Sequence, residues 1–228
     1  MRLGDCGIAA SGCKYFASVL STNQKELDLR GSKLGDSGVK QLCERLNHPN
    51  CKLQRLVLGD CGIAASGCKY FASVLSANQT LKELDLRGSK LGDLGVKQLC
   101  EGLKHPDCKL QKLVLGYCGI TASDCKYLAS VLSTNQTLKE LDLGGNKQAN
   151  SGVKLLCEGL KHPDCKLQRL VLRSCYFKDA CMRDLSLALS INHSLNELDL
   201  QFNLLSFPFV THLYKELKCR RSNLKIIM

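Results

Sequence analysis

The sequence contains no long apolar run. A membrane-spanning helix needs about 20 consecutive apolar residues, and no stretch of this 228-residue chain approaches that length. The first residues, MRLGDCGIAASG, carry one arginine with no long apolar segment behind it, unlike a secretory signal. The sequence therefore predicts a cytoplasmic protein without membrane contact, and its fifteen cysteines are expected to be reduced thiols.

Common enzyme motifs are also missing. The dipeptide Gly-Lys never occurs, which excludes the phosphate-binding loop G-x-x-x-x-G-K-[ST], and neither H-E-x-x-H nor G-x-S-x-G is present. The five histidines lie in repeated turns or near predicted helix ends, with no evident nucleophile beside them. We therefore expect a protein that is not an enzyme and that needs no cofactor.

Acidic residues are in short supply. The 32 lysines and arginines outnumber 21 aspartates and glutamates, giving a formal net charge of +11. Such an excess favours acidic partners without identifying one. Because no pattern of stacking aromatics and no glycine-rich RNA motif accompanies the lysines, specific nucleic-acid binding is not expected.

What the sequence does contain is a repeat. Segments beginning with CKLQ start at Cys51, Cys108 and Cys165, 57 residues apart, and each holds two similar halves such as LQRLVLGDC and LKELDLRGS. Both halves fit L-x-x-L-x-L-x-x-(N/C), the strand-and-turn pattern of leucine-rich repeats. The ninth position of this pattern recurs at Cys6, Ser32, Cys61, Ser89, Cys118, Asn146, Cys175 and Asn203.

A helix is predicted after each strand. Cys68, Phe71, Ala72 and Leu75 have the i, i+3, i+4, i+7 spacing of one apolar helix face, and Val96, Leu99, Cys100 and Leu103 repeat it. A strand and a helix cannot enclose a core alone, so stacked units must bury the leucines between neighbours. The prediction is an α/β leucine-rich repeat horseshoe of about eight repeats, with parallel strands on the concave face and helices on the convex face.

The whole chain, residues 1–228, is predicted to be a single repeat domain. The first repeat, residues 1–31, is expected to be truncated and loose, because STNQKELDL at Ser21 lacks the Thr-Leu pair of STNQTLKELDL. Met1–Gly4 aligns with the strand at 56–59, so the stacking surface before it lacks a cap and the chain looks cut from something longer. Residues 204–228 are expected to form a C-terminal capping repeat that ends in a short strand at 224–227.

The cysteines raise the question of a metal or redox site, because CEGLKHPDC at Cys100 to Cys108 is repeated at Cys157 to Cys165. A zinc site needs about four convergent ligands, and this segment offers three at most. Equivalent residues of successive 57-residue units lie two strands apart, about 10 Å. We therefore interpret the thiols as structural, with metal binding and redox chemistry as lesser alternatives.

The concave face supplies the candidate contact residues. The third strand position reads Glu26, Arg55, Glu83, Lys112, Glu140, Arg169 and Glu197, and these alternating charges should pair across strands. The row either binds a partner or neutralises itself; we favour self-neutralisation but keep both. Tyr117 and Phe202, at the eighth position, resemble interface anchors. The candidate partner-contact residues are Arg55, Glu83, Asp85, Arg87, Lys112, Tyr117, Glu140, Asp142, Arg169, Arg173, Glu197 and Phe202.

The wording of the repeats, LCEGLKHPDCKLQ, SVLSTNQTLKELDL and G-D-x-G-V-K-x-L-C, resembles the ribonuclease-inhibitor subfamily of leucine-rich repeats. It is most similar to the C-terminal repeats of NOD-like receptors with a pyrin domain, the NLRP group. This resemblance implies a non-catalytic interaction or sensing module of an innate immune receptor, involved in inflammasome regulation. Its implied partners are proteins on the concave face or rim, upstream NACHT and pyrin modules, or other receptor chains.

A second function is a ribonuclease-inhibitor-like protein that binds and blocks a hydrolase. A clamp for a basic ribonuclease should be acidic, because complementary potentials drive encounter. The net charge of +11 disfavours this alternative.

Overall fold

The computed structural model describes residues 1–15, 24–220 and 223–228. Its contacts divide the chain into two compact units, Met1–Gly119 and Ile120–Met228. Among the described residues, no helix is both long and apolar enough to cross a membrane.

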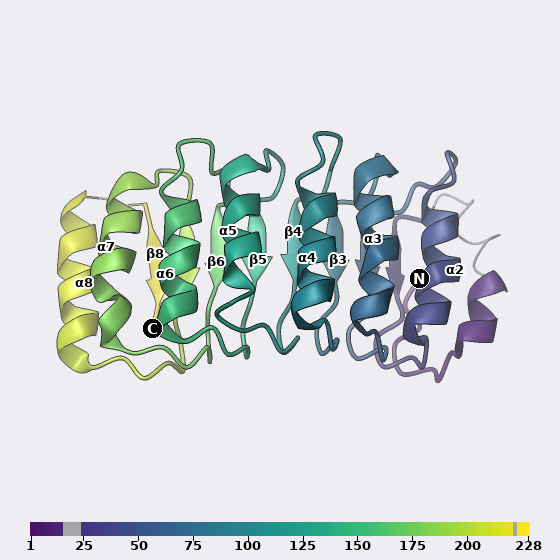
Figure 1. Ribbon diagram of the computed structural model, residues 1–228, viewed down its shortest axis with the longest axis horizontal. Coiled ribbons are helices and arrows are strands. Elements are labelled where there is room, and N and C mark those ends of the chain that lie inside the picture. The colour runs from purple at the N-terminus through teal and green to yellow at the C-terminus, as the bar shows by residue number, and fades with distance from the viewer. Residues whose placement is uncertain (16–23, 221–222) are drawn as a thin grey trace. The chain divides into compact units, whose positions relative to one another are not determined.

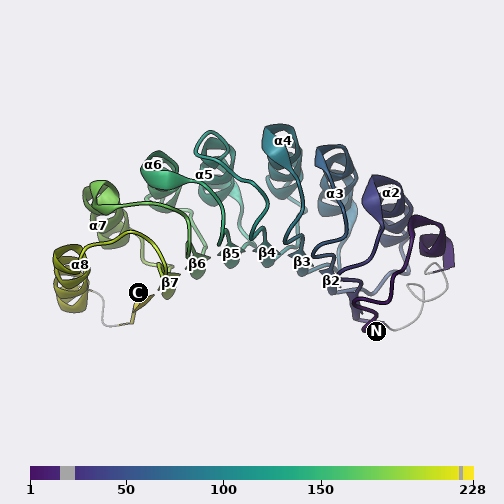
Figure 2. The same cartoon turned by 90° about the horizontal axis from the view of Figure 1, so that it is seen from below.

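Unit 1 alternates short strands with helices. Its strands β1 (Glu26–Asp28), β2 (Arg55–Val57), β3 (Glu83–Asp85) and β4 (Lys112–Val114) pair in parallel in chain order. The intervening helices are η1 (Ala10–Tyr15), α2 (Gly35–Leu46), α3 (Ala65–Ala77) and α4 (Gly92–Leu103). The strands of this unit form one layer and its helices lie along one side of them (Figures 1 and 2).

Unit 2 has the same construction. Strands β5 (Glu140–Asp142), β6 (Arg169–Val171), β7 (Glu197–Asp199) and β8 (Lys225–Ile227) pair in parallel in that order. The helical segments are α5 (Cys125–Thr134), α6 (Ala149–Leu160), η2 (Asp179–Cys181), α7 (Met182–Ile191) and α8 (Phe207–Arg220). The predicted α/β repeat, with parallel strands in one layer and helices in the other, is confirmed.

Leucines fill the space between the two layers because the repeat places them on the helix side of each strand. Leu53, Leu56 and Leu58 are fully buried, and so are Val96 and Leu99 on the facing side of α4. Burying each such side chain contributes about 1.5–3 kcal/mol. The predicted helix stripe is confirmed in α3 too, although Ala72 is only half-buried.

The beginning of the chain is less regular than its sequence predicts. Instead of a strand at residues 1–4, there is an isolated parallel bridge between Arg2 and Asp28, with the Leu3 N–H donating to the Asp28 carbonyl at 2.8 Å. The segment Ala10–Tyr15 is a 3₁₀-helix, not an α-helix. Residues 16–23, which include the first three residues of STNQKELDL, lie outside the described residues, and the looseness of the first repeat stays a prediction.

The end of the chain is close to its prediction. The expected strand at 224–227 is β8, and it pairs with β7 through Glu197 and Lys225. An apolar helical stripe is also present in α8, where Leu213 is fully buried and Val210 is half-buried.

Buried asparagines tie neighbouring repeats together. The Asn78 side chain donates from Nδ2 to the carbonyl of Leu46, the last residue of α2, at 2.6 Å. Its Oδ1 accepts the N–H groups of Thr80 and Leu81 at 2.9 and 2.7 Å. Asn192 makes the same contacts in unit 2, with Leu160 as its acceptor at 2.9 Å. Each asparagine therefore supplies hydrogen-bond partners for the carbonyl at the end of one helix and for the N–H groups just before the following strand.

Replacing Asn78 with alanine is expected to destabilise the protein by about 3 kcal/mol. The change leaves the Leu46 carbonyl and two N–H groups without their partner, and each buried polar group left unpaired costs about 1–3 kcal/mol. Urea denaturation of wild type and Asn78→Ala measures the loss. The matched control is Gln79→Ala, because Gln79 is exposed and its change should stay within about 0.5 kcal/mol. Equal losses in the two variants would contradict this account.

Candidate functional site

The strand face of unit 1 carries a row of ion pairs at the third position of the repeat. In the parallel register Glu26, Arg55, Glu83 and Lys112 lie on successive strands. Arg55 Nη1 contacts Glu26 Oε1, and Arg55 Nε donates to Glu83 Oε2 at 3.0 Å. Burial lowers the pKa of Arg55, but the two flanking carboxylates outweigh it and the pKa is raised overall. The predicted pairing across strands is confirmed here.

Unit 2 repeats this pairing. Arg169 Nε donates to Glu197 Oε1 at 2.8 Å, and Lys225 Nζ lies 3.9 Å from Glu197 Oε2. The hydrogen bond from Arg169 holds the pKa of Glu197 below its usual value and raises the pKa of Arg169. These side chains are part-exposed, so each pair contributes no more than about 1 kcal/mol.

The fifth position of the strand has a different role from the third. The carboxylate oxygens of Asp28, Asp85, Asp142 and Asp199 accept the N–H of the residue two further along, at 2.9–3.1 Å. Each aspartate therefore closes the turn that follows its strand. The alternate strands carry Val57, Val114 and Val171, and all three are buried.

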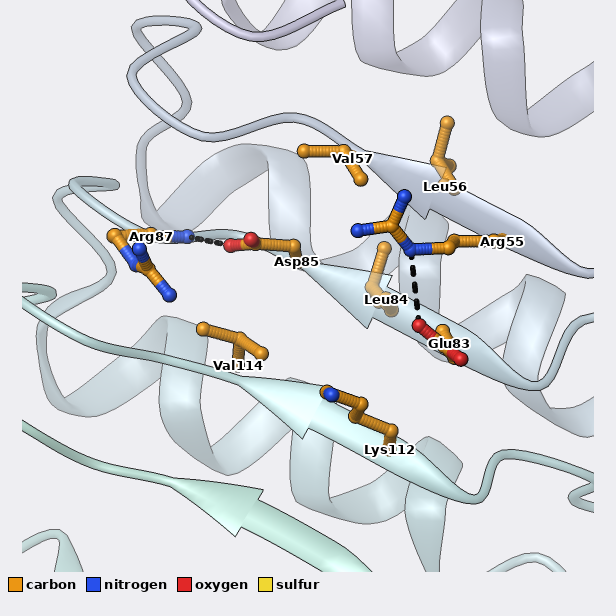
Figure 3. A pocket seen from close by; sticks show the side chains of 9 residues that line it. All are labelled: Arg55, Leu56, Val57, Glu83, Leu84, Asp85, Arg87, Lys112 and Val114. Carbon is orange, nitrogen blue, oxygen red and sulfur yellow. Dashed lines mark hydrogen bonds and ion pairs between the residues drawn. The ribbon is translucent and has the colours of Figure 1, made fainter. Parts of the chain in front are cut away.

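These two rows enclose a hollow on the strand face of unit 1 (Figure 3). Five predicted contact residues come together there: Arg55, Glu83, Asp85, Arg87 and Lys112. Val57 and Val114 lie on either side of Asp85, with Leu56 and Leu84 also in the lining. The hollow thus presents three cationic and two anionic side chains to a partner, above valine and leucine side chains that are almost fully buried. Such a lining suits amino-acid side chains of a partner protein.

The other predicted contact residues lie elsewhere. Tyr117 is in unit 1 but does not line the hollow, and its side chain is 59% exposed. Glu140, Asp142, Arg169, Arg173, Glu197 and Phe202 belong to unit 2. Of these, Arg169 and Glu197 are in direct contact, and Phe202 is 78% exposed.

The eighth position of the repeat has a left-handed backbone. Asp60, Gly88, Tyr117 and Phe202 all have φ between +55° and +71°. The Asp60 side chain lies against Gly88 of the next repeat, in the space that a Cβ atom would need. A Cβ atom built on Gly88 would overlap Asp60 Oδ1. The backbone angle favours glycine at 88 without requiring it, and the Asp60 side chain leaves no room for a Cβ atom there.

Sequence reasoning missed two features of this surface. Val57 and Val114, at the fifth strand position, were not among the predicted contact residues although they line the hollow. Tyr176, Leu204 and Phe207, each more than 60% exposed, were not singled out. The sequence could have shown them, because they depart from the repeat. The equivalent positions in unit 1 hold Gly62, Lys90 and Asp93.

The cysteines are part of the interior. Cys100 and Cys108 of CEGLKHPDC are buried, while His105 between them accepts the Asp107 N–H at 3.3 Å in the exposed turn. Burial raises the pKa of Cys118 and Cys175 to about 12, which keeps them as thiols. Their Sγ atoms lie 3.2 and 3.3 Å from the carbonyls of Leu86 and Leu143 and donate to them.

A buried protonated thiol is a poor nucleophile and a poor metal ligand. Across the part of the chain that the structure describes, no three His, Cys, Asp or Glu side chains converge as a metal site. These findings agree with a structural role for the thiols.

The fold and the repeat spacing define the class of this protein. The family model described as "Leucine Rich repeat" matches residues 21–43, 50–72, 77–100, 107–129 and 134–157, and the chain belongs to this family. Modules of this kind bind other proteins.

Among curated proteins, the chain is 47% identical over 205 residues to human "NACHT, LRR and PYD domains-containing protein 12", covering 89% of this chain and 19% of that protein. It is 42% identical over 205 residues to mouse "Ribonuclease inhibitor", covering 89% of this chain and 45% of that protein. The chain thus spans less than half the length of either relative. Among solved structures, a chain of the Rad7 and Elc1 complex in yeast matches with a TM-score of 0.56 at 16% identity. The match covers 96% of this chain and 60% of that chain, and it supports the fold.

Proposed function

We propose that the chain is a non-catalytic protein-binding module of an NLRP-type innate immune receptor, acting in the cytoplasm. The strand face makes the contact, and the hollow around Asp85 is its centre. The observation that carries this proposal is the gathering of Arg55, Arg87 and Lys112 beside Val57 and Val114. Similarity to the repeats of a NACHT and PYD protein supports the receptor class. NACHT and pyrin modules or other receptor chains are the natural partners of such a module.

Charge reversal at the hollow tests this function. The variant Arg87→Glu/Lys112→Glu keeps the buried valines and leucines but reverses two cations of the lining. We expect proteins captured from cytosol by the wild-type chain to be lost by this variant, quantified by mass spectrometry. The matched control is Lys97→Glu, an exposed lysine on α4 of the same unit. Equal capture by the wild type and the double variant would overturn the strand face as the contact surface.

The ribonuclease-inhibitor-like alternative is favoured by the 42% identity to that protein. The net charge of +11 opposes it, because a cationic chain and a basic ribonuclease repel each other. Calorimetric titration with a basic pancreatic-type ribonuclease decides between the two functions. We expect no binding at micromolar concentrations, and a nanomolar Kd would establish the alternative instead.

A further inference from the structure

Four large apolar side chains are exposed in the loops that follow β6 and β7 of unit 2 and at the first residue of α8. Tyr176, Phe202, Leu204 and Phe207 are 62%, 78%, 61% and 82% exposed. A single exposed apolar residue is ordinary on a protein surface, but a group of them in neighbouring loops marks an interaction site.

The two loops run side by side. The Ser174 N–H donates to the Gln201 carbonyl at 2.9 Å, and the Leu204 N–H donates to the Phe177 carbonyl at 3.1 Å. One residue before Phe207, the Ser206 N–H donates to Asp179 Oδ1 at 2.9 Å. The four apolar residues therefore lie in adjacent segments at the carboxyl ends of β6 and β7. We call this group the apolar edge.

The repeat itself does not need these residues. In unit 1 the equivalent positions hold Gly62, Gly88, Lys90 and Asp93, and the strands and helices form without apolar side chains there. Tyr176 and Phe202 also have φ of 61° and 58°, a region that bulky residues rarely adopt. The repeat imposes this backbone angle, so placing aromatic residues there carries a backbone cost that glycine in other repeats avoids.

The charge around the apolar edge is positive. Arg173 and Lys178 lie in the loop that follows β6, and Lys147 lies in the loop that follows β5. These two loops are also adjacent, because the Gly145 N–H donates to the Arg173 carbonyl at 2.9 Å. Asp179 is the one carboxylate in residues 144–150, 172–180 and 200–206, and its Oδ1 already accepts the Ser206 N–H. A second copy of this chain, with a net charge of +11, is repelled from this surface, whereas an acidic partner is attracted.

We propose that the apolar edge is a docking surface for a protein segment that presents an aromatic or aliphatic side chain flanked by acidic residues. The apolar side chain would contact Phe202 and its neighbours, and the carboxylates would face Lys147, Arg173 and Lys178. Buried aromatic anchors supply most of the affinity in such contacts, and the charged rim supplies attraction and orientation. This surface belongs to unit 2 and does not depend on the hollow of unit 1.

A random peptide library displayed on phage tests the proposal with the full chain as target. We expect enriched peptides to combine an aromatic residue or leucine with aspartate or glutamate, and we measure the affinity of synthetic copies by calorimetry. The variant Tyr176→Gly/Phe202→Gly/Leu204→Lys restores the residues that other repeats carry, so it should fold with an unchanged or higher Tm. Its affinity for the peptides should fall at least tenfold, and Lys147→Glu/Lys178→Glu should weaken binding several-fold at low salt.

Two controls separate this surface from the rest of the molecule. Leu94→Ser changes a 58% exposed leucine on α4 to the serine found at Ser37, and it should leave peptide affinity unchanged. Arg87→Glu/Lys112→Glu should also leave it unchanged, because the hollow lies in unit 1. The proposal is wrong if no peptide is enriched, if the enriched peptides lack acidic residues, or if the triple variant binds like wild type. Concentration-dependent self-association that this variant abolishes would overturn it in favour of a second copy.

Discussion

Raising the pH from 8 to 10 is expected to unfold this protein. Burial raises the pKa of Cys61 and Cys181 to about 11, and that of Cys68, Cys118, Cys125 and Cys175 to about 12. The usual value of 9.0 applies once the chain is unfolded. Between pH 9 and the raised pKa values the unfolded chain binds fewer protons than the folded chain, so stability falls as the pH rises.

The size of the effect follows from the number of thiols. At pH 10, one unit above the unfolded value, each protected thiol costs the folded state about 1.4 kcal/mol. Six of them together cost about 8 kcal/mol, which is comparable to the whole stability of a typical domain. At pH 8 and below both states hold nearly all of these protons, and the stability is retained. Circular dichroism in reducing buffer from pH 7 to 11 follows the transition.

A triple serine variant isolates the contribution of the ninth-position thiols. Cys61→Ser/Cys118→Ser/Cys175→Ser replaces three thiols that donate to the carbonyls of Leu29, Leu86 and Leu143 with hydroxyls of similar size, and it removes three groups that ionise. Ser32 and Ser89 already occupy this position in other repeats. The alkaline midpoint should move upward, and unfolding should release about three fewer protons. An unchanged midpoint would show that these thiols do not control alkaline unfolding.

Replacing Gly102 with alanine is expected to destabilise the protein, although alanine ordinarily favours a helix by about 1 kcal/mol over glycine. A Cβ atom on Gly102 would lie 2.7 Å from Ala72 Cα and 2.8 Å from the Ala72 carbonyl oxygen. Because both are backbone atoms, helices α3 and α4 must separate to admit it. Overpacking of this kind costs about 1–3 kcal/mol. Gly159 has the same relation to Ala129 in unit 2, so Gly159→Ala should behave alike.

The chain supplies its own control for this prediction. Helix α2 carries Arg45 where α4 has Gly102, so that position of the repeat already accepts a side chain there. Arg45→Ala should change the free energy of unfolding by less than about 0.5 kcal/mol. Thermal and urea denaturation of the three variants measure the difference. A stabilising effect of Gly102→Ala would mean that the two helices approach less closely than described.

The fold was predictable because the repeat fixes it. A period of 28 or 29 residues places each strand at the third to fifth positions of L-x-x-L-x-L, and the described strands occupy those positions. Periodicity also identified the buried helix face, since apolar spacing follows the helical turn. The isolated bridge and the 3₁₀-helix of the first repeat could not be predicted in this way, because a two-residue gap breaks the register on which the prediction depends.

The candidate site was predictable only in part. Alternation of Glu and Arg predicted the pairs at Arg55 and Arg169, because parallel strands bring equivalent positions together. It could not show that Asp85 would bond its own turn, since that depends on the backbone angle after the strand. The burial of Val57 was equally hidden, because residue order gives the face of a strand but not what covers it.

The left-handed eighth position has a consequence for how this surface can diversify. Its backbone is the same whether it holds Asp60, Gly88 or Tyr117, so a new side chain there changes the exterior while leaving the repeat intact. The overlap between Asp60 and any Cβ atom at position 88 adds a constraint between neighbours. A sequence that gains a large residue at 88 must move the Asp60 side chain away or replace it, so these positions should covary during evolution although they are 28 residues apart.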